Sequence, residues 1–417
     1  MFDVVVVGAG FSGLQAALSA QKAGLSVAIV EARDRIFKQR LGETAVMVLE
    51  DGKRIEFPHG ITPEFSSKDK KNLEMIHDHI QAESLQPNGL GKEDDQVSLD
   101  QYVRNLGARP KTLAMVNLWV RVMHGLESTE ESAAWFIEYC RTNHGLLAIR
   151  ADDVTGSNYM RIKSGTQSIA KGIANLVGHA NIHLNEPVAS IQDNTSHVVV
   201  KTTTGKAFKA KKLIISMPSA MLKELNFSPP LPQRAQEVYN NTKLGHYKKA
   251  IAFYEKPWWR DLGYNGFFMD YQGPACVVRD TSFDDVGLYG FTCFVNGKAG
   301  EEWAAKYPHE RRKLILDQIA RAFDVGPDSV AYRPMEFVEQ IWQHEQFSRG
   351  ALAPVTKIGH LTEYADIYGK PIGNTHFVGT EHAKHWKGYL EGALASGEVG
   401  AKEVIEALEQ QLPKSRL

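Results

Sequence analysis

The stretch FDVVVVGAGFSGL, residues 2–14, decides the fold. Its first half, Phe2–Val7, has the length and the unbroken apolar composition of a buried parallel strand. Its second half, Gly8–Gly13, predicts a tight turn, and the apolar spacing in Leu14–Ala23 predicts a helix. Val27–Glu31 is then typical of a second strand. These segments make one βαβ unit, which is the context that a dinucleotide-binding turn requires.

The glycine spacing in the turn suits a pyrophosphate. Gly8 permits the tight turn, Gly10 lets the backbone approach the phosphates, and Gly13 lets the helix pack closely on the strand. The helix that follows the turn directs the partial positive charge of its amino terminus at the phosphates. Glu31 ends the second strand about 20 residues further on, where a carboxylate accepts both ribose hydroxyls. The pattern predicts an unphosphorylated dinucleotide, and a chance glycine-rich turn is the alternative.

Length and composition limit the remaining possibilities. A chain of 417 residues exceeds the size of one hydrophobic core, so two interleaved domains are expected. A net charge of -1 gives no basic excess for nucleic acid. No apolar run approaches the roughly 20 residues that span a bilayer, so no membrane insertion is expected. Cys140, Cys276 and Cys293 lack metal-ligand spacing and are expected to be buried thiols.

Periodicity along the chain predicts an α/β protein. Residues 66–145 carry apolar positions at helical spacing and indicate an inserted helical region. Alternating runs separated by turns predict an antiparallel meander over residues 182–217. The further elements expected are a β-rich region that begins with Lys248–Tyr254, a helix at Arg311–Phe323, a short strand at His376–Gly379 and a terminal helix from about Tyr389 to Leu412.

Motifs outside the βαβ unit resemble those of the flavin monoamine oxidase family, including its fungal members, over nearly the whole chain. The most specific block is Trp386–Ala393, and further matches are Glu31–Arg35, Ser164–Gln167, Glu186–Val188, Met217–Ser219, Phe227–Pro232 and Phe377–Glu381. The resemblance implies a two-domain α/β flavoprotein. A Rossmann-like FAD-binding domain is expected at residues 1–65, 150–230 and 340–417, and an inserted α+β substrate-binding domain at 66–149 and 231–339. The active site is expected where the two domains meet.

The resemblance also implies which residues hold FAD. The expected cofactor-binding residues are Gly8, Gly10, Ser12, Gly13, Glu31, Arg33, Val188, Gly379, Glu381 and Leu390. In the family, the backbone of Val188 holds the adenine end, and Glu381 lies near the ribityl chain and the pyrophosphate. The terminal helix would also direct its positive end and the N–H of Leu390 at the flavin edge where negative charge gathers on reduction. An ordinary surface helix is the alternative.

Three further residues are expected at the reacting centre. Lys249 matches the family's lysine that holds a water against flavin N5. It shares a strand face with Ile251 and Phe253, so it is expected to point towards an apolar interior, whereas Lys248 lies on the opposite face with small alanines. An edge-strand lysine that reaches water is the alternative. Tyr389 matches one of the two aromatic residues that flank the substrate nitrogen.

The other aromatic position holds Leu352, so the pocket keeps apolar contact but loses part of the attraction of a π face for an amine. A core tyrosine at a helix start is the alternative role for Tyr389. Ala351 stands where animal monoamine oxidases attach the flavin through a cysteine. FAD is therefore expected to bind non-covalently.

The chain departs from the family after Arg35. Where relatives have a Gly-Gly-Arg or Gly-Gly-Lys turn and an acidic, glycine-rich loop, this chain reads Ile36–Glu43, and it rejoins the family pattern at Asp51–Pro58. A stretch that contacts the cofactor in the family is thus missing or replaced. Weak or lost FAD binding is one expectation, and replacement of the lost phosphate-binding charge by Arg35, Lys38 or Arg40 is the other.

The main functional hypothesis is the oxidation of a primary amine. An uncharged amine gives a hydride to the flavin, O2 takes the electrons to form H2O2, and water hydrolyses the imine to aldehyde and ammonia. One alternative is an amino-acid or polyamine oxidase, for which Arg121 or Arg141 would bind a carboxylate or acidic residues would line a tunnel. The other is a non-catalytic homologue. Ser415–Leu417 resembles the Ser-Lys-Leu peroxisomal address and predicts an import receptor as partner.

Overall fold

The computed structural model describes residues 2–7, 11–31, 44–59, 66–151 and 166–410. The chain divides into two compact units. Unit 1 comprises residues 1–36, 164–243 and 353–417, and unit 2 comprises residues 37–163 and 244–352. The sequence placed the corresponding boundaries at 65, 150, 230 and 340. The chain passes from one unit to the other within β10 (Lys243–Gly245) and within β16 (Ala351–Val355).

Unit 1 is built on a parallel sheet. Its strands are β5 (Ile182–Leu184), β2 (Val27–Glu31), β1 (Phe2–Val7), β8 (Ala207–Ile215) and β17 (Thr375–Phe377), in that order. The predicted strands Phe2–Val7 and Val27–Glu31 are confirmed with these bounds. All five strands run parallel, so their carboxyl ends meet at one edge of the sheet.

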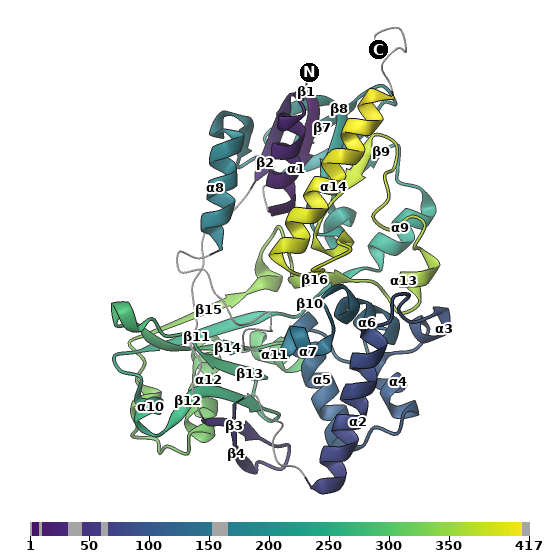
Figure 1. The fold of residues 1–417 in the computed structure, drawn as a ribbon. Helices are drawn as coiled ribbons and strands as arrows, with labels where there is room; N and C mark the ends of the chain where they lie inside the picture. Colours follow the sequence, from purple (N-terminus) through teal and green to yellow (C-terminus); the bar gives the residue numbers. More distant parts are fainter. Residues whose placement is uncertain (1, 8–10, 32–43, 60–65, 152–165, 411–417) are drawn as a thin grey trace. The chain divides into compact units, whose positions relative to one another are not determined.

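Strand β1 faces two different cores because successive side chains point to opposite sides of a sheet. Val4 and Val6 pack with helices α1 (Phe11–Lys22), α8 (Gln167–Val177) and α14 (Leu390–Glu409). Helices α1 and α14 lie side by side (Figure 1). Both helices begin and end within a few residues of their predicted bounds.

The opposite face of the same sheet is covered by the predicted meander. Val5 and Val7 pack with residues of β6 (Val188–Asp193) and β7 (Val198–Thr202). β6 pairs with β7 and β7 with the first half of β8, in both cases antiparallel. The remaining elements of this layer are β9 (Asn226–Ser228), α9 (Gln233–Asn240) and α13 (His360–Glu363). Unit 1 is therefore a sandwich of helices, parallel sheet and meander.

The helical part of unit 2 confirms the helical region predicted over 66–145. Its helices are α2 (Ser67–Ser84), α3 (Lys92–Asp95), α4 (Leu99–Asn105), α5 (Pro110–His124), α6 (Ala133–Thr142) and α7 (Leu146–Arg150). The hydroxyls of Ser66, Ser98 and Ser132 accept backbone N–H bonds at the starts of α2, α4 and α6. These caps explain where the three helices begin.

The rest of unit 2 is a seven-stranded sheet. Its strands, in order, are β15 (Glu336–Ile341), β11 (Lys248–Tyr254), β14 (Tyr289–Phe294), β13 (Val277–Asp280), β12 (Tyr264–Asp270), β3 (Thr44–Val48) and β4 (Arg54–Pro58). Helices α10 (Trp258–Asp261), α11 (Gly297–Ala304) and α12 (Pro308–Ala322) contribute to the core on one face. β11 is confirmed with its predicted bounds, whereas β3 was not predicted. Within the described ranges, no helix combines the length and apolarity needed to cross a membrane.

Candidate functional site

The carboxyl edge of the unit 1 sheet brings together segments that are far apart in the sequence. Val7 pairs with Ile215, and Ile215 pairs with Phe377, so the segments that follow the three strands leave the sheet at the same edge. The backbone N–H and the hydroxyl of Ser216 both donate to the carbonyl of Val7, at 2.9 and 2.8 Å. Parallel α/β sheets bind their ligands at this edge. Gly8, Gly10 and Arg33 lie outside the described residues.

The adenosine end of the predicted site has a defined backbone. Glu31 is the last residue of β2 and pairs with Leu184. Val188 follows Leu184 by four residues, so their Cα atoms are at most about 15 Å apart. Glu186, between them, accepts hydrogen bonds from Thr202 and from Lys206, which lies at 2.6 Å. The Lys206 ammonium, helped by the threonine hydroxyls, lowers the pKa of Glu186 to about 2. This carboxylate fixes the turn that leads to Val188.

The phosphate end is defined by the start of α1. Ser12 and Gly13 lie in its first turn and are buried, and that turn carries no acidic side chain. Helix α14 approaches at backbone distance, because a Cβ on Gly397 would lie 2.2 Å from the carbonyl oxygen of Ser12. The amino-terminal N–H groups of α1 therefore keep their positive potential for an anion.

Glu381 is a buried carboxylate at the same edge, in the short helix η6 (Thr380–His382). It is 5% exposed and accepts a hydrogen bond from the backbone N–H of Ser219 at 2.9 Å. A Cβ on Gly379 would lie 2.4 Å from a Glu381 oxygen, so a side chain at this position would displace the carboxylate. The hydroxyls of Ser219 and Tyr368 lie 3.0 Å apart. Burial, reinforced by the charge of Glu381, raises the pKa of Tyr368, so its hydroxyl stays protonated at neutral pH.

The start of α14 is held next to this carboxylate. Tyr389 precedes the helix, Leu390 is its first residue, and the Thr380 hydroxyl donates to the carbonyl of Tyr389 at 2.9 Å. A Cβ on Gly392 would lie 2.1 Å from the carbonyl oxygen of Trp386. Leu390 remains 38% exposed, so the first turn of α14 is accessible. The edge of unit 1 thus gathers a carboxylate, two helix amino termini and cradles that only glycine leaves open, which fits an extended dinucleotide such as FAD.

Lys249 lies on the less buried face of β11, and this corrects one expectation. The fully packed face is that of Lys248, Ala250 and Ala252, whereas Lys249, Ile251 and Phe253 are half-buried. The larger apolar residues Ile251 and Phe253 had indicated that their face was the interior. The small alanines instead allow bulky residues of the core, such as Trp303, to pack against the strand. Lys249 places its ammonium 5.1 Å from the centre of the Phe294 ring.

The two residues expected to flank the substrate nitrogen belong to different units. Leu352 is the second residue of β16 and is 49% exposed. Tyr389 is half-buried, and its ring lies 5.9 Å from that of Trp386 at 77°. Both side chains are accessible on their own unit.

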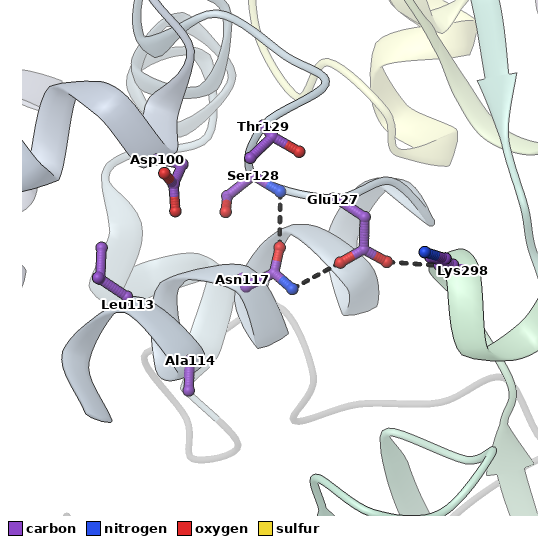
Figure 2. Close-up of a pocket in the computed structure, with 8 residues that line it drawn as sticks. All are labelled: Asp100, Leu113, Ala114, Asn117, Glu127, Ser128, Thr129 and Lys298. Carbon is purple, nitrogen blue, oxygen red and sulfur yellow. Dashed lines mark hydrogen bonds between the residues drawn. The ribbon is translucent and has the colours of Figure 1, made fainter. Parts of the chain in front are cut away.

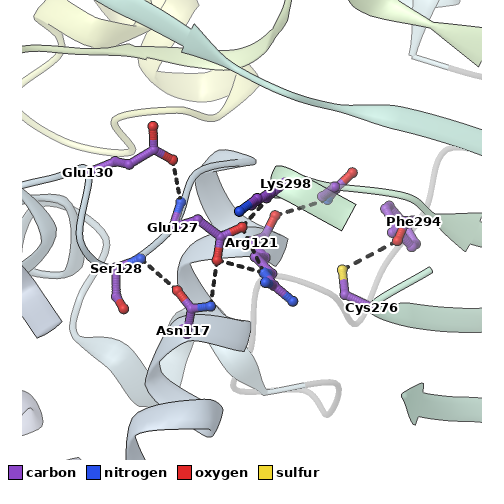
Figure 3. Close-up of polar contacts among 9 residues, drawn as sticks. Asn117, Arg121, Glu127, Ser128, Glu130, Cys276, Phe294 and Lys298 are labelled. Carbon is purple, nitrogen blue, oxygen red and sulfur yellow. Dashed lines mark hydrogen bonds and ion pairs between the residues drawn. The ribbon is translucent and has the colours of Figure 1, made fainter. Parts of the chain in front are cut away.

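The arginines suggested for a carboxylate-binding role are already paired with acidic residues. Arg121 donates to both carboxylate oxygens of Glu127 at 2.9 Å (Figure 3). Arg141 makes two bonds of 2.7 Å with Glu138. A hollow of about 290 Å³ beside Glu127 is lined by Asp100, Leu113, Ala114, Asn117, Glu127, Ser128, Thr129 and Lys298 (Figure 2). Several of its polar groups bond to one another, since Asn117 links Glu127 to the backbone of Ser128. None of the predicted site residues lines it.

The three thiols are buried, as predicted. Burial raises the pKa of Cys276 to about 12, and its sulfur donates to the carbonyl of Phe294 at 3.3 Å. Burial also raises the pKa values of Cys140 and Cys293. All three therefore remain protonated and unreactive at neutral pH.

Sequence reasoning missed two features of these sites. Ser219 donates to Glu381, and Tyr368 contacts the Ser219 hydroxyl, across large separations in sequence for which the chain gives no local signal. Arg279 lies on the same sheet face as Lys249, and the alternation within Val277–Asp280 was an available signal for it.

Comparisons with known proteins agree with this geometry. A family model described as flavin containing amine oxidoreductase matches residues 57–405, and one described as FAD dependent oxidoreductase matches residues 3–45. The chain is 30% identical to the probable flavin-containing monoamine oxidase A of Dictyostelium discoideum, over 98% of each protein. It is 26% identical to the flavin-containing amine oxidase B of Sus scrofa, over 97% of this chain and 86% of that protein.

Solved structures show the same fold. The structure of wild-type putrescine oxidase bound to putrescine superposes with a TM-score of 0.87 at 23% identity, over 97% of this chain and 99% of that one.

Proposed function

We propose that this chain, which belongs to the flavin-containing amine oxidoreductase family, oxidises a primary amine with O2 as electron acceptor. FAD-dependent oxidation of amines is the function that family membership gives it. The observation that carries the proposal is the buried Glu381, fixed by Ser219 at the edge of the sheet where β1 ends. A buried carboxylate in that place needs a polar ligand or a strong structural reason.

Residues of unit 1 would hold FAD in an extended form. Glu31 would bind the ribose, the amino terminus of α1 at Ser12 would face the pyrophosphate, and Glu381 would lie beside the ribityl chain. The start of α14 at Leu390 would place positive potential at the flavin edge. When bound, FAD supplies the two-electron acceptor that no side chain can provide.

Residues near the reacting carbon position the substrate and do not attack it. Tyr389 and Leu352 would flank the substrate nitrogen, and their apolar surfaces favour the uncharged amine over the ammonium ion. Lys249 would hold a water molecule near the reacting carbon. The overall reaction consumes the amine, O2 and one water, and it releases aldehyde, ammonia and H2O2.

Non-covalent attachment of FAD is a further part of the proposal. Ala351 occupies the first position of β16, where the resemblance would place an attachment cysteine. A methyl group cannot form a thioether. Acid precipitation of the protein should therefore release all of its flavin into the supernatant.

The proposed location is the peroxisome, where H2O2 is degraded. The support is the terminal Ser415–Leu417, which lies outside the described residues. A fluorescent protein fused ahead of the last ten residues should enter peroxisomes, and the same fusion without the last three should remain in the cytoplasm. Equal cytoplasmic signal from both fusions would contradict this location.

The test of the activity starts from purified protein with and without added FAD. We expect a flavin absorption spectrum, release of the flavin on acid precipitation, and H2O2 formation with at least one primary amine. A protein that takes up no FAD would show that the replaced segment after Arg35 abolishes binding. That result, or bound FAD with no peroxide from any amine, would favour the non-catalytic alternative.

A further inference from the structure

The hollow beside Glu127 is lined by a polar side chain that the fold leaves unbonded. Ser128 is 2% exposed, and both of its backbone groups are engaged. Its N–H donates to the Asn117 side chain at 2.7 Å, and its carbonyl accepts from the N–H of Asp100 at 2.9 Å. Within the described ranges its hydroxyl has no hydrogen-bond partner, and it lines the hollow (Figure 2). A buried hydroxyl gains free energy from a partner, which a ligand can supply.

A carboxylate lies next to this hydroxyl. Asp100 is in the first turn of α4 and is tied to Ser128 by the backbone bond. The oxygens of the two side chains point in the same direction, towards the helix that carries Leu113 and Ala114 (Figure 2). The hollow thus combines two hydrogen-bond acceptors with apolar surface. This composition suits a small organic molecule that has one polar end.

Asp100 presents negative charge to the hollow although it has a partner. Arg104, one turn further along α4, donates to it at 2.6 Å. The side chain of Arg104 is 51% exposed and that of Asp100 is 16% exposed, so water screens the guanidinium more strongly than the carboxylate. Exposed ion pairs at this spacing are weak, and a carboxylate oxygen can accept a second hydrogen bond. Asp100 can therefore also bind a cationic donor.

The second carboxylate of the hollow has no such capacity. Both oxygens of Glu127 accept hydrogen bonds from the side chains of Asn117 and Arg121 (Figure 3). The backbone N–H of Lys298 adds another donor at 2.8 Å. The Lys298 side chain also lines the hollow and brings a positive charge beside Glu127. The part of the hollow that favours a cation is therefore the part at Asp100, and a second cation would be repelled by Lys298.

We propose that this hollow binds a small primary ammonium ion at a second, non-catalytic site. The ammonium group would donate to the carboxylate of Asp100 and to the hydroxyl of Ser128, and its alkyl group would contact Leu113 and Ala114. The volume of about 290 Å³ lies at the small end of the range for ligand pockets, so the ligand has few carbon atoms. The inference does not depend on amine oxidation, because no residue proposed to contact FAD or the substrate lines the hollow.

Three probes of matched shape test the assignment. tert-Butylammonium, tert-butanol and pivalate share one apolar group and differ in charge. tert-Butylammonium has no hydrogen on the carbon beside nitrogen, so it cannot give a hydride and can be titrated in air. We expect a dissociation constant on the order of 1 mM at pH 7, measured from the tert-butyl NMR signal. The alcohol and the carboxylate should bind at least about tenfold more weakly.

Three variants locate the bound cation. Asp100→Asn should weaken the binding of tert-butylammonium by about tenfold or more, because it removes the charge. Ser128→Ala should weaken it by about three- to tenfold, because it removes one acceptor. Ala114→Leu should weaken it by filling the hollow, without a change in charge. If Asp100→Asn does not fold, Ala114→Leu and the three probes still decide.

Asp69→Asn is the matched control. Asp69 lies in the first turn of α2 and binds Arg109 at 2.8 Å. The side-chain exposures of this pair, 14% and 50%, are close to those of Asp100 and its arginine, but Asp69 does not line the hollow. The control should bind tert-butylammonium as the wild-type protein does.

Each outcome bears on one claim. Equal binding of tert-butanol, or stronger binding of pivalate, would show that the hollow does not select a cation. Unchanged binding in Asp100→Asn and Ala114→Leu would place the ammonium ion elsewhere, and either result overturns the proposal. A protein that oxidises no amine but binds tert-butylammonium as expected would contradict the proposed function and support this inference.

Discussion

The two faces of the unit 2 sheet put neighbouring lysines in opposite environments. Lys248 is 1% exposed beneath α11, and its ammonium has no hydrogen-bond partner. Burial lowers its pKa to about 8, although Glu301 acts in the opposite direction. Lys249 is half-buried over Phe294 on the face that also carries Arg279. One face thus holds a lysine within a core, and the other leaves its lysine half-buried.

The comparison shows that strand alternation separates two faces without saying which is the core. Both faces of β11 carry apolar residues. The elements that pack on the sheet decide which of its faces is the core. The alanines mark the packed face because aromatic side chains of the core need room there. Substitutions on the two faces should therefore have different effects.

Removal of the Lys249 cation should affect the reaction most. We expect Lys249→Met to lower the rate of flavin reduction or reoxidation by about 100-fold, ~2.7 kcal/mol, because an oriented polar group at the reacting centre is lost. FAD content and thermal stability should stay near those of the wild type. Rapid-mixing absorbance measurements with and without O2 would identify the slowed step. A variant with full activity would show that Lys249 has no role in the reaction.

Enlargement of the packed face should destabilise unit 2. Ala252→Leu adds volume where the site is fully buried, and we expect it to cost about 2–3 kcal/mol of unfolding free energy. Ile251→Val on the Lys249 face should cost about 1 kcal/mol or less. Denaturant unfolding measures both. Equal losses would mean that the two faces are packed alike.

Replacement of the buried lysine should stabilise the protein. Lys248→Met keeps most of the side-chain volume and removes an unpaired ammonium, so we expect a gain of about 2 kcal/mol at pH 7. The same replacement at Lys249 should give no such gain. A loss of stability in Lys248→Met would indicate that this ammonium has a partner.

The buried ammonium of Lys248 should also make the stability of the protein depend on pH. The pKa of Lys248 is lowered from 10.5 to about 8 on folding, so between these values the unfolded chain binds the proton and the folded chain does not. Unfolding free energy should therefore rise with pH across this window and stay level below it. Lys248→Met should lack this contribution, which a comparison of unfolding midpoints at pH 8 and pH 10 would reveal.

The smallest effect concerns the ring beneath Lys249. Phe294→Leu removes the π face but keeps an apolar contact, so we expect a change of only about 0.5–1 kcal/mol, two- to fivefold in kcat/KM. A change as large as that of Lys249→Met would show that the ring has a direct role with the substrate.

Local signals explain what the sequence could predict. Phe2–Val7, the glycine turn and Val27–Glu31 are specified within one βαβ unit, and both strands have the predicted bounds. β3 pairs locally with β4, and its other partner, β12, is more than 200 residues away in the chain. The bond from Ser219 to Glu381 spans 162 residues, and Arg279 meets Thr292 only through strand register. Long-range pairing therefore completes sites that the motifs only begin.

The most direct test of amine oxidation is the absorbance of the FAD-bound protein mixed with a panel of primary amines that includes benzylamine, first without O2 and then with air. Our account predicts that the oxidised flavin band disappears without O2 and returns with air as H2O2 forms. A band that persists with every amine of the panel would contradict it.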